Sequence, residues 1–251
     1  MKYNFIVLCA VLSFVTFPVL GQSQKIVPCS DIFEYSVKIA EGKTDVLSAD
    51  FSDLELGTLT GKELRLLRNM IYAKYGYKFK SLDLQKYFMK FTWYKPMHEN
   101  IDSLMTELDK KNIGRVKFFE DFKGSDSHPE EINLNGLWQD IPIAASGWSD
   151  VFYFSGGNSV CFYVSQMDSD NDDDNGGKIS KFLGTYKIQD SFLYINFKNI
   201  VLNNEATYSC DCNLKFPIYS YEENKKIAAE LYKNKVSIGT KNFYYFEGTY
   251  E

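Results

Sequence analysis

The sequence predicts an α+β protein: a small all-helical N-terminal domain followed by an antiparallel β domain of barrel or sandwich type, with one helix near the C-terminus. Apolar residues recur at three- and four-residue spacing up to about residue 122, which is typical of helices. From about residue 134, short aromatic and β-branched runs alternate with turn residues, which is typical of strands. The segment between them is polar and contains Gly124 and Pro129, a linker composition. We therefore expect a signal peptide (1–21), a helical domain (22–123), a linker (124–133) and a β domain (134–251).

The first 21 residues have the three parts of a secretory signal peptide. Lys2 supplies positive charge, Phe5 to Leu20 form an apolar run, and Gly21 ends it with a small residue. The run of about 16 residues is shorter than the ~20 residues of a spanning helix, which argues against a retained membrane anchor. Cys9 lies inside the run and Cys29 lies well beyond it, which argues against a lipoprotein. We expect cleavage after Gly21, a secreted or periplasmic protein, and no stable membrane span.

Composition narrows the classes of function. A net charge of −5 and a pI near 5.3 argue against a nucleic-acid partner, because such proteins normally carry a basic patch. Aromatic residues make up 16% of the chain, and Tyr and Phe supply most of them. Aromatic side chains stabilise sheets through cross-strand packing, so we assign most of them to core and sheet surface. A surface that stacks on sugars or peptides is the alternative.

The N-terminal half carries the start and stop signals of several helices. Thr60 and Glu63 form a capping box, in which each side chain satisfies a free N–H group of the first turn. Leu64, Leu67 and Ile71 then form one apolar stripe, which Gly76 ends. We expect three further helices, over residues 31–41, 81–90 and about 102–122.

One stretch of this half resembles a known family. The run from Leu64 to Phe79, Leu-Arg-Leu-Leu-Arg-Asn-Met-Ile-Tyr-Ala-Lys-Tyr-Gly-Tyr-Lys-Phe, is similar to the central motif of the YARHG domain family. Tyr87-Phe88, Trp93-Tyr94-Lys95-Pro96 and Asn112-Ile113 follow at the places of later family landmarks, so the resemblance covers roughly residues 55–120. It implies a small helical domain of unknown activity in a bacterial secreted or envelope protein.

The chain departs from the family at its naming pentad. The pentad reads Tyr72-Ala73-Lys74-Tyr75-Gly76, so Lys replaces Arg and Tyr replaces His. A family role for that His as ligand or base would be lost here, and packing and helix termination by Gly76 become the better explanation. The candidate partner contacts are Arg68, Asn69, Trp93 and Tyr94. The alternative for Arg68 and Asn69 is structural: Arg68 pairs with a buried carboxylate or carbonyls, and Asn69 bonds a loop backbone.

The C-terminal half is a series of strands and tight turns. Residues 152–154 and 160–164 flank the turn 155–158, and residues 181–188 and 192–197 flank the loop 189–191. A capping box at Ser220 to Glu223 predicts a helix that reaches Leu231, and strands at 236–238 and 243–246 follow. The opening Gly-x-Trp at 136–138, with Gly-Thr-Tyr at 184–186, is faintly similar to lipocalin-like domains.

The export signal affects how the cysteines are interpreted. Cys29, Cys161, Cys210 and Cys212 remain after cleavage, and an even number in an oxidising compartment suggests disulfides. A bridge between Cys210 and Cys212 would close a strained loop with one residue between them. We therefore expect them to take separate partners, one with Cys161 and one with Cys29. A thiolate metal site is the weaker alternative, because Cys-x-Cys lacks the two-residue spacer usual at zinc.

An acidic loop is the sharpest local feature of the β half. Asp168, Asp170, Asp172 and Asp174 stand at alternate positions before Asn175-Gly176-Gly177. Ca²⁺ binds six to eight oxygens, so such a loop is a candidate calcium site. The loop departs from an EF-hand, with Asn175 and Lys181 at the positions of its Gly and Glu. The alternative is a solvated hairpin loop without metal, and no other cofactor is expected.

The sequence shows no catalytic constellation. Its two histidines, His98 and His128, are interpreted as loop residues, although His98 with Glu99 and Asp102 is a conceivable metal cluster. No phosphate loop or zinc-protease or nucleophile motif occurs. We therefore expect no enzyme activity, but a binding module of the bacterial envelope whose partner is a protein or a glycan. The alternatives are a small-ligand protein with a cavity lined by Phe162, Tyr186 and Phe197, and a cryptic hydrolase built on carboxylates.

Overall fold

The structure is a computed structural model that describes residues 26–122, 132–141, 149–164, 179–220 and 235–246. The chain divides into two compact units. One unit spans residues 33–123, and the other combines the chain up to Ile32 with the chain from Gly124 onward. Residues 26–32 therefore belong to the second unit, although they precede the helices of the first unit along the chain.

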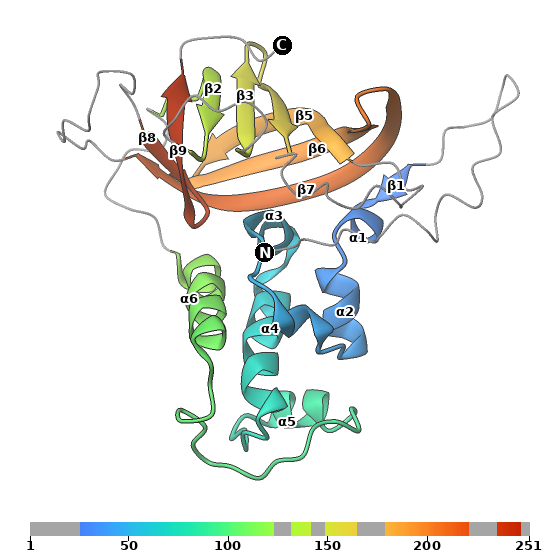
Figure 1. The fold of residues 1–251 in the computed structure, drawn as a ribbon, viewed down its shortest axis with the longest axis vertical. Coiled ribbons are helices and arrows are strands. Elements are labelled where there is room, and N and C mark those ends of the chain that lie inside the picture. The colour runs from blue at the N-terminus through green and yellow to red at the C-terminus, as the bar shows by residue number, and fades with distance from the viewer. Residues whose placement is uncertain (1–25, 123–131, 142–148, 165–178, 221–234, 247–251) are drawn as a thin grey trace, which may run out of the picture. The chain divides into compact units, whose positions relative to one another are not determined.

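The first unit is helical (Figure 1). Its elements are α2 (Tyr35–Glu41), the 3-10 helix η2 (Asp45–Ser48), α3 (Asp53–Thr58), α4 (Gly61–Lys74), α5 (Leu82–Phe88) and α6 (Glu107–Asp121). The expected capping box begins α4: Thr60 Oγ1 accepts from Glu63 N, and Glu63 accepts from Thr60 N at 2.9 Å. A second box, formed by Thr106 and Asp109, begins α6 at Glu107, later than the expected start near residue 102.

The helix expected over residues 31–41 is interrupted. A short α1 (Cys29–Ile32) belongs to the other unit, and α2 begins only at Tyr35. Gly42 ends α2 in the left-handed conformation with φ +66°, as its position in the sequence indicated.

The core of the helical unit lies along α4 and α6, which run beside each other in Figure 1. Leu67, Met70 and Ile71 of α4 and Val116 of α6 are fully buried. Leu67 and Ile71 belong to the apolar stripe read from the sequence, so hydrophobic burial determines which faces meet.

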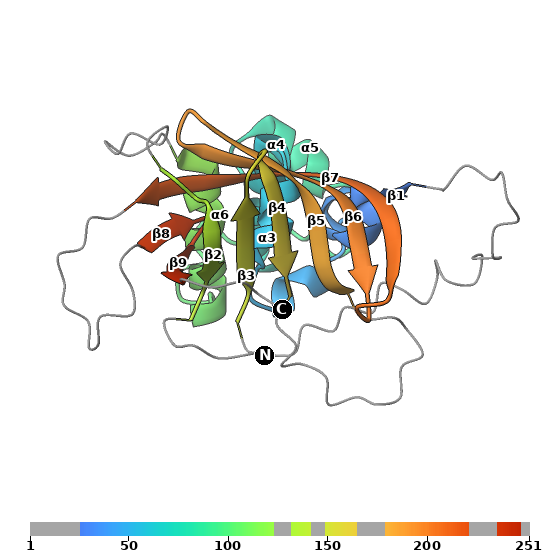
Figure 2. The same ribbon diagram turned by 90° about the horizontal axis from the view of Figure 1, so that it is seen from above.

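The second unit is a sheet of nine strands (Figure 2). They are β1 (Val27–Pro28), β2 (Gly136–Gln139), β3 (Val151–Ser155), β4 (Ser159–Tyr163), β5 (Ile179–Gln189), β6 (Phe192–Leu202), β7 (Ala206–Ser220), β8 (Lys235–Ile238) and β9 (Lys241–Phe246). The strand order is β1-β7-β6-β5-β4-β3-β2-β9-β8, and β8 also pairs with β7. The strands from β2 to β9 therefore form a ring in which each pairs antiparallel with its neighbours in sequence, and β9 pairs with β2.

The ring confirms the expected α+β class and the antiparallel sheet, and it is not a two-sheet sandwich. β1 is the exception in direction, because it adds to β7 in parallel. The expected hairpins are present as β3–β4 and β5–β6, with Asn158, Asp190 and Ser191 at positive φ in their turns. The helix expected near Ser220 to Leu231 lies outside the described residues.

Phenylalanine rings fill the core of the β unit. The Phe152 ring lies 4.6 Å from that of Phe162, and the Phe182 ring lies 5.0 Å from that of Phe197. All four side chains are at most 3% exposed. Trp138, Phe154, Phe216 and Phe243 are buried as well, so part of the aromatic content of the β half serves as core.

Candidate functional site

The naming pentad at the end of α4 binds a buried carboxylate. Asp109, 1% exposed, accepts a hydrogen bond from Tyr75 Oη at 2.6 Å and forms an ion pair with Lys74. Its Oδ2 also accepts from the backbone N–H and the hydroxyl of Thr106, at 2.9 and 2.8 Å. Asp109 is therefore both the capping residue of α6 and the partner of two side chains of the pentad.

The contacts of Asp109 favour its ionised form. Burial raises the pKa of Asp109, but hydrogen bonds from Lys74, Tyr75 and Thr106 outweigh it and hold the pKa below its ordinary value. Burial, together with the Asp109 carboxylate, raises the pKa of Tyr75 to about 12. Tyr75 therefore keeps its proton at neutral pH. Through their contacts with Asp109, Lys74 and Tyr75 act as a clasp between α4 and α6.

Gly76 joins the pentad to the following loop. It has φ +71°, and an added Cβ would lie 2.5 Å from the carbonyl oxygen of Lys95. The Gly76 carbonyl accepts from the backbone N–H groups of Met97 and His98 at 2.8 and 2.9 Å. Only glycine permits this close approach, which brings residues 95–98 beside the end of α4.

The polar candidates on α4 have partners inside the helical unit. Arg68 forms an ion pair with Glu120 of α6, and one of its N–H groups donates to Glu120 Oε1 at 3.2 Å. Asn69 is 7% exposed, and its Nδ2 donates to the carbonyl oxygen of Arg65 at 2.7 Å. Arg68 thus follows its structural alternative, whereas Asn69 bonds a carbonyl of its own helix instead of a loop backbone. Both polar groups are used internally.

The two aromatic candidates for contacting a partner, Trp93 and Tyr94, differ in how deeply they are buried. Tyr94 is 6% exposed and donates from its hydroxyl to the Tyr77 carbonyl at 2.7 Å, so it belongs to the core. Trp93 is half-buried, stacks on Phe91 with ring centroids 5.7 Å apart, and donates from Nε1 to the Gly42 carbonyl at 2.8 Å. The expectation that Tyr94 contacts a partner is wrong, because its ring and its hydroxyl are both used internally.

Exposed lysines flank these aromatic residues along the chain. Phe79 contacts Phe88 and Tyr94, with ring centroids 5.0 and 6.0 Å apart, so one aromatic core joins the loop after α4, α5 and the loop after α5. The segments that meet there carry exposed lysines, which we call the lysine face: Lys78, Lys80, Lys86, Lys90 and Lys95. This basic segment could have been found from the sequence, because residues 74–98 contain six lysines and one carboxylate, Asp83, in a chain of net charge −5.

Large apolar side chains stand among these lysines. Leu82, Met89 and Met97 are 72%, 64% and 61% exposed, the three highest values among the exposed large apolar residues of the described chain. Leu82, Lys86 and Met89 recur at four- and three-residue spacing along α5 and its end, so they share one side of that helix. The surface is therefore both basic and apolar.

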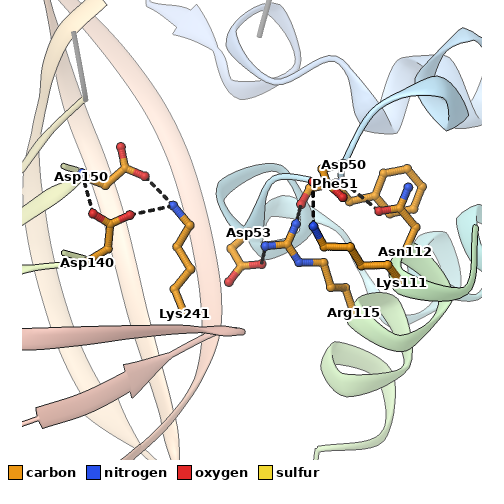
Figure 3. A network of polar contacts seen from close by, with 9 residues as sticks. All are labelled: Asp50, Phe51, Asp53, Lys111, Asn112, Arg115, Asp140, Asp150 and Lys241. Atoms are coloured by element: carbon orange, nitrogen blue, oxygen red, sulfur yellow. Dashed lines mark hydrogen bonds and ion pairs between the residues drawn. The ribbon is translucent and has the colours of Figure 1, made fainter. Parts of the chain in front are cut away.

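A second polar network in this unit attaches a loop to α6 (Figure 3). The side-chain amide of Asn112 accepts from Phe51 N at 3.0 Å and donates to the Ala49 carbonyl at 2.8 Å. Lys111 pairs with Asp50 at 2.7 Å, while Asp50 Oδ1 is buried without a hydrogen bond among the described residues. Asn112, a family landmark in the sequence, is thus a structural anchor.

The β unit has a charged cluster of its own (Figure 3). Lys241, at the start of β9, lies 3.0 Å from Asp140 Oδ2 and 2.7 Å from Asp150 Oδ2. Burial lowers the pKa of Lys241, but the two carboxylates outweigh it and hold the pKa above the ordinary value. Burial, with Asp150 nearby, raises the pKa of Asp140. The cluster links the end of β2 with the starts of β3 and β9.

The four cysteines are free thiols in the structure. Cys210 and Cys212 lie on the buried side of β7, together with Leu214 and Phe216. On β4, Val160 and Phe162 lie on that same side, so Cys161 between them points to the other face of the sheet. The expected bridge from Cys161 to Cys210 or Cys212 is therefore wrong, because neighbours in a strand point to opposite faces.

The remaining sequence candidates carry no site in the described chain. The acidic loop with Asp168, Asp170, Asp172 and Asp174 lies outside the described residues, so calcium binding there stays a prediction. Within the described ranges, no group of His, Cys, Asp or Glu could hold a metal ion, the surroundings of His98 included. Phe162 and Phe197, expected to line a ligand cavity, pack their rings against Phe182, and ligand binding in the β unit stays a prediction.

These features define a two-unit α+β protein whose helical unit is held together by the contacts of a signature pentad. Residues 43–121 match the family model of the YARHG domain, so the chain contains this domain. The match confirms the resemblance and spans η2 to α6, with the pentad and Asp109 inside it. Searches of curated proteins and of solved structures found no match. Among the described residues, no helix is long and apolar enough to span a membrane.

Proposed function

We propose that this protein is a non-catalytic interaction module of the bacterial cell envelope, and that its YARHG domain docks on an anionic membrane surface. The observation that carries the proposal is the lysine face with Leu82, Met89 and Met97 exposed among its charges. A basic surface with protruding apolar side chains fits the boundary between anionic headgroups and acyl chains.

The charges of this face are available to a partner. Among the described residues, Lys80, Lys86, Lys90 and Lys95 have no carboxylate within ion-pair distance, and Lys78 is 3.8 Å from Glu99. A lysine near an anionic membrane contributes about 1 kcal/mol of attraction. Four such lysines therefore supply a useful binding free energy without any new internal contact.

The exposed apolar groups favour lipid over glycan. Sugar-binding surfaces stack rings on exposed aromatic side chains, but here Tyr94 is buried and Trp93 already stacks on Phe91. The exposed groups are instead aliphatic and thioether chains, which insert among acyl chains without a geometric partner. The proposed partner is therefore an anionic lipid surface, and binding to an acidic glycan is an outcome that the test must distinguish.

The proposed location in the cell envelope rests on the predicted signal peptide and on the YARHG domain. The predicted signal peptide exports the chain, and the YARHG domain is typical of extracellular and periplasmic proteins. The absence of catalysis is part of the proposal: the polar networks around Asp109 and Asn112 are engaged in joining helices and loops, with donors and acceptors used internally.

Vesicle co-sedimentation tests the proposal. The full chain is mixed with zwitterionic vesicles and with vesicles that contain about one-third anionic lipid, since charge drives this kind of attraction. We expect binding to the anionic vesicles alone. The triple variant Lys80→Glu, Lys86→Glu, Lys90→Glu should lose it, whereas a control of equal charge change, Lys43→Glu, Lys62→Glu, Lys110→Glu, should retain it.

Three outcomes would contradict the proposal: no binding to either vesicle, equal loss in both triple variants, or retention by an acidic glycan and not by lipid. Far-UV circular dichroism of both variants checks that the helical unit is intact. The control lysines are exposed and lie in the same unit. Lys43 and Lys110 pair with Glu41 and Glu107, but exposed pairs of this kind contribute little to stability, so the control should stay folded.

A further inference from the structure

Three thiols gather at the edge of the β unit. The Cys212 side chain is a neighbour of both Cys210 and Cys29, which interact with it electrostatically. Cys210 and Cys212 are 2% and 0% exposed, whereas Cys29, at the first position of α1, is half-buried. The cluster thus has two enclosed members and one that solvent reaches.

Sheet register explains why residues so distant in sequence meet. β1 runs parallel to β7, with Val27 opposite Cys210 and Pro28 opposite Asp211. The next residue along the chain is Cys29, which therefore arrives beside Cys212. β7 also carries an irregularity here, because Ser209 pairs with Asn199 and Cys212 with Phe197, so two residues of β7 face one of β6.

The environment differentiates the thiols. The hydrogen bond from Cys212 lowers the pKa of Cys29, although burial raises it. Interactions with Cys210 and with Cys29, together with burial, raise the pKa of Cys212 far above its usual range. Because the thiolate is the attacking species in exchange reactions, Cys29 combines the two properties of a reactive cysteine, access and a stabilised anion.

We propose that Cys29 and Cys212 are a redox-active pair that closes into a disulfide and fastens residues 27–32 to β7. The Cys29 thiolate attacks one sulfur of a disulfide oxidant, and the other sulfur leaves as a thiolate that takes up a proton. Cys212 then transfers its proton to solvent and attacks the mixed disulfide at Cys29, which releases the second thiol. Two cysteine thiols and one oxidant disulfide thus become one protein disulfide and two free thiols.

The consequence is a switchable attachment of the N-terminal segment. In the reduced protein a ladder of two residue pairs joins β1 to β7. A strand of this length is held weakly, so the segment separates more readily than the long β6–β7 pairing. Oxidation replaces this weak attachment with a covalent one, whereas Cys161 on the other face of the sheet takes no part.

Non-reduced peptide mapping of the full chain tests the pair. The protein is incubated with oxidised glutathione, free thiols are alkylated, and trypsin then releases Cys29 in residues 26–38 and Cys210 with Cys212 in residues 199–215. We expect a linked species of these two peptides, which disappears on reduction. Cys29→Ser and Cys212→Ser should abolish it, and Cys210→Ser and Cys161→Ser should retain it.

Several results would overturn the inference. One is that Cys29 is still fully alkylated after incubation with oxidised glutathione, because it has formed no disulfide. The others are a bridge between Cys210 and Cys212 alone, a bridge to Cys161, and a linked species that persists in Cys212→Ser. A second measurement does not depend on how the Cys212 variant folds: in the reduced wild type, iodoacetamide should label Cys29 at least about tenfold faster than the buried Cys161. Equal labelling rates would contradict the assignment of Cys29 as the attacking thiol.

Discussion

Asp109 shows how a family signature can be structural. In the pentad the family's Arg and His are replaced by Lys74 and Tyr75, yet both replacements donate to the same carboxylate. A hydrogen-bond donor at each position is what Asp109 requires, and lysine and tyrosine supply it as well as arginine and histidine. The departure from the family pattern therefore preserves the contact between α4 and α6.

Asp109→Asn should destabilise the protein by about 3 kcal/mol, because it leaves Lys74 without its buried counter-charge and weakens the capping box of α6. Urea denaturation followed by circular dichroism measures the change. The matched control is Asp83→Asn, whose carboxylate is 63% exposed and pairs with Arg65, and which should destabilise the protein far less because a surface ion pair contributes little. Equal effects of the two substitutions would show that Asp109 is no more than a surface charge.

Glu55 makes a pH-dependent contribution of the opposite sign to the usual carboxylate. Burial raises its pKa to about 7 from an ordinary 4.5, although a hydrogen bond from Tyr35 and the nearby Lys38 lower it. Its stabilising contribution is therefore complete below the unfolded-state pKa and is lost as the pH rises through the folded-state pKa. Between pH 4.5 and pH 8 we expect a loss of up to about 3 kcal/mol from this residue.

The variant Glu55→Gln isolates the pH-dependent contribution of Glu55 to the free energy of unfolding, since glutamine keeps the size of the side chain without titrating. The difference in unfolding free energy between Glu55→Gln and wild type should grow in favour of the variant from pH 5 to pH 8. Glu107→Gln, with a carboxylate that is 91% exposed, should show no such trend. A difference independent of pH would mean that Glu55 is not protonated in the folded protein at pH 5.

At the scale of the elements, Gly76 and Gly114 form a natural pair for comparison. Gly76→Ala should cost more than about 1 kcal/mol, because φ is +71° and the new Cβ would meet the Lys95 carbonyl. Gly114→Ala lies inside α6 with open space around the new Cβ, and should stabilise by about 0.5–1 kcal/mol. Thermal denaturation of both variants measures the contrast, and a Gly76→Ala protein as stable as wild type would refute the close approach.

Local signals in the sequence predicted most elements of the fold. The box at Thr60 and Glu63 and the hairpin turns were recognised because their residues lie within four positions of one another. The start of α6 was missed, although Thr106 and Asp109 form the same kind of box with Asp in place of Glu. β7 was missed too, although Cys210, Cys212, Leu214 and Phe216 alternate with polar residues over its length.

Long-range pairings could not be read in the same way. The contacts of Asp109 with Lys74 and Tyr75 span about 35 residues, and β1 meets β7 across nearly the whole chain. Nothing local encodes such partners, because they depend on which apolar faces pack together. The expected bridge to Cys161 failed for this reason: residue types suggested it, but strand alternation places Cys161 on the opposite face from Cys210 and Cys212.

At the scale of the whole molecule, charge is unevenly distributed along the chain. The protein carries a net charge of −5, yet residues 74–98 are strongly basic. An acidic protein is repelled from an anionic membrane at long range, so attraction has to come from a local surface. The lysine face supplies one, and its effect depends on how far the charges of the rest of the protein are screened.

Salt should therefore weaken the proposed docking in a graded way. The Debye length falls from about 10 Å at 0.1 M salt to about 3 Å at 1 M, which removes most of the attraction between exposed lysines and lipid headgroups. In vesicle titrations over this range, we expect the lipid concentration for half-maximal binding to rise at least about tenfold for the wild type. The variant Leu82→Ser, Met89→Ser should bind more weakly at every salt concentration but keep the same salt dependence, because it removes apolar insertion and leaves the charges. Wild-type binding that is insensitive to salt would contradict a role for the lysine face and would assign the interaction to the apolar side chains alone.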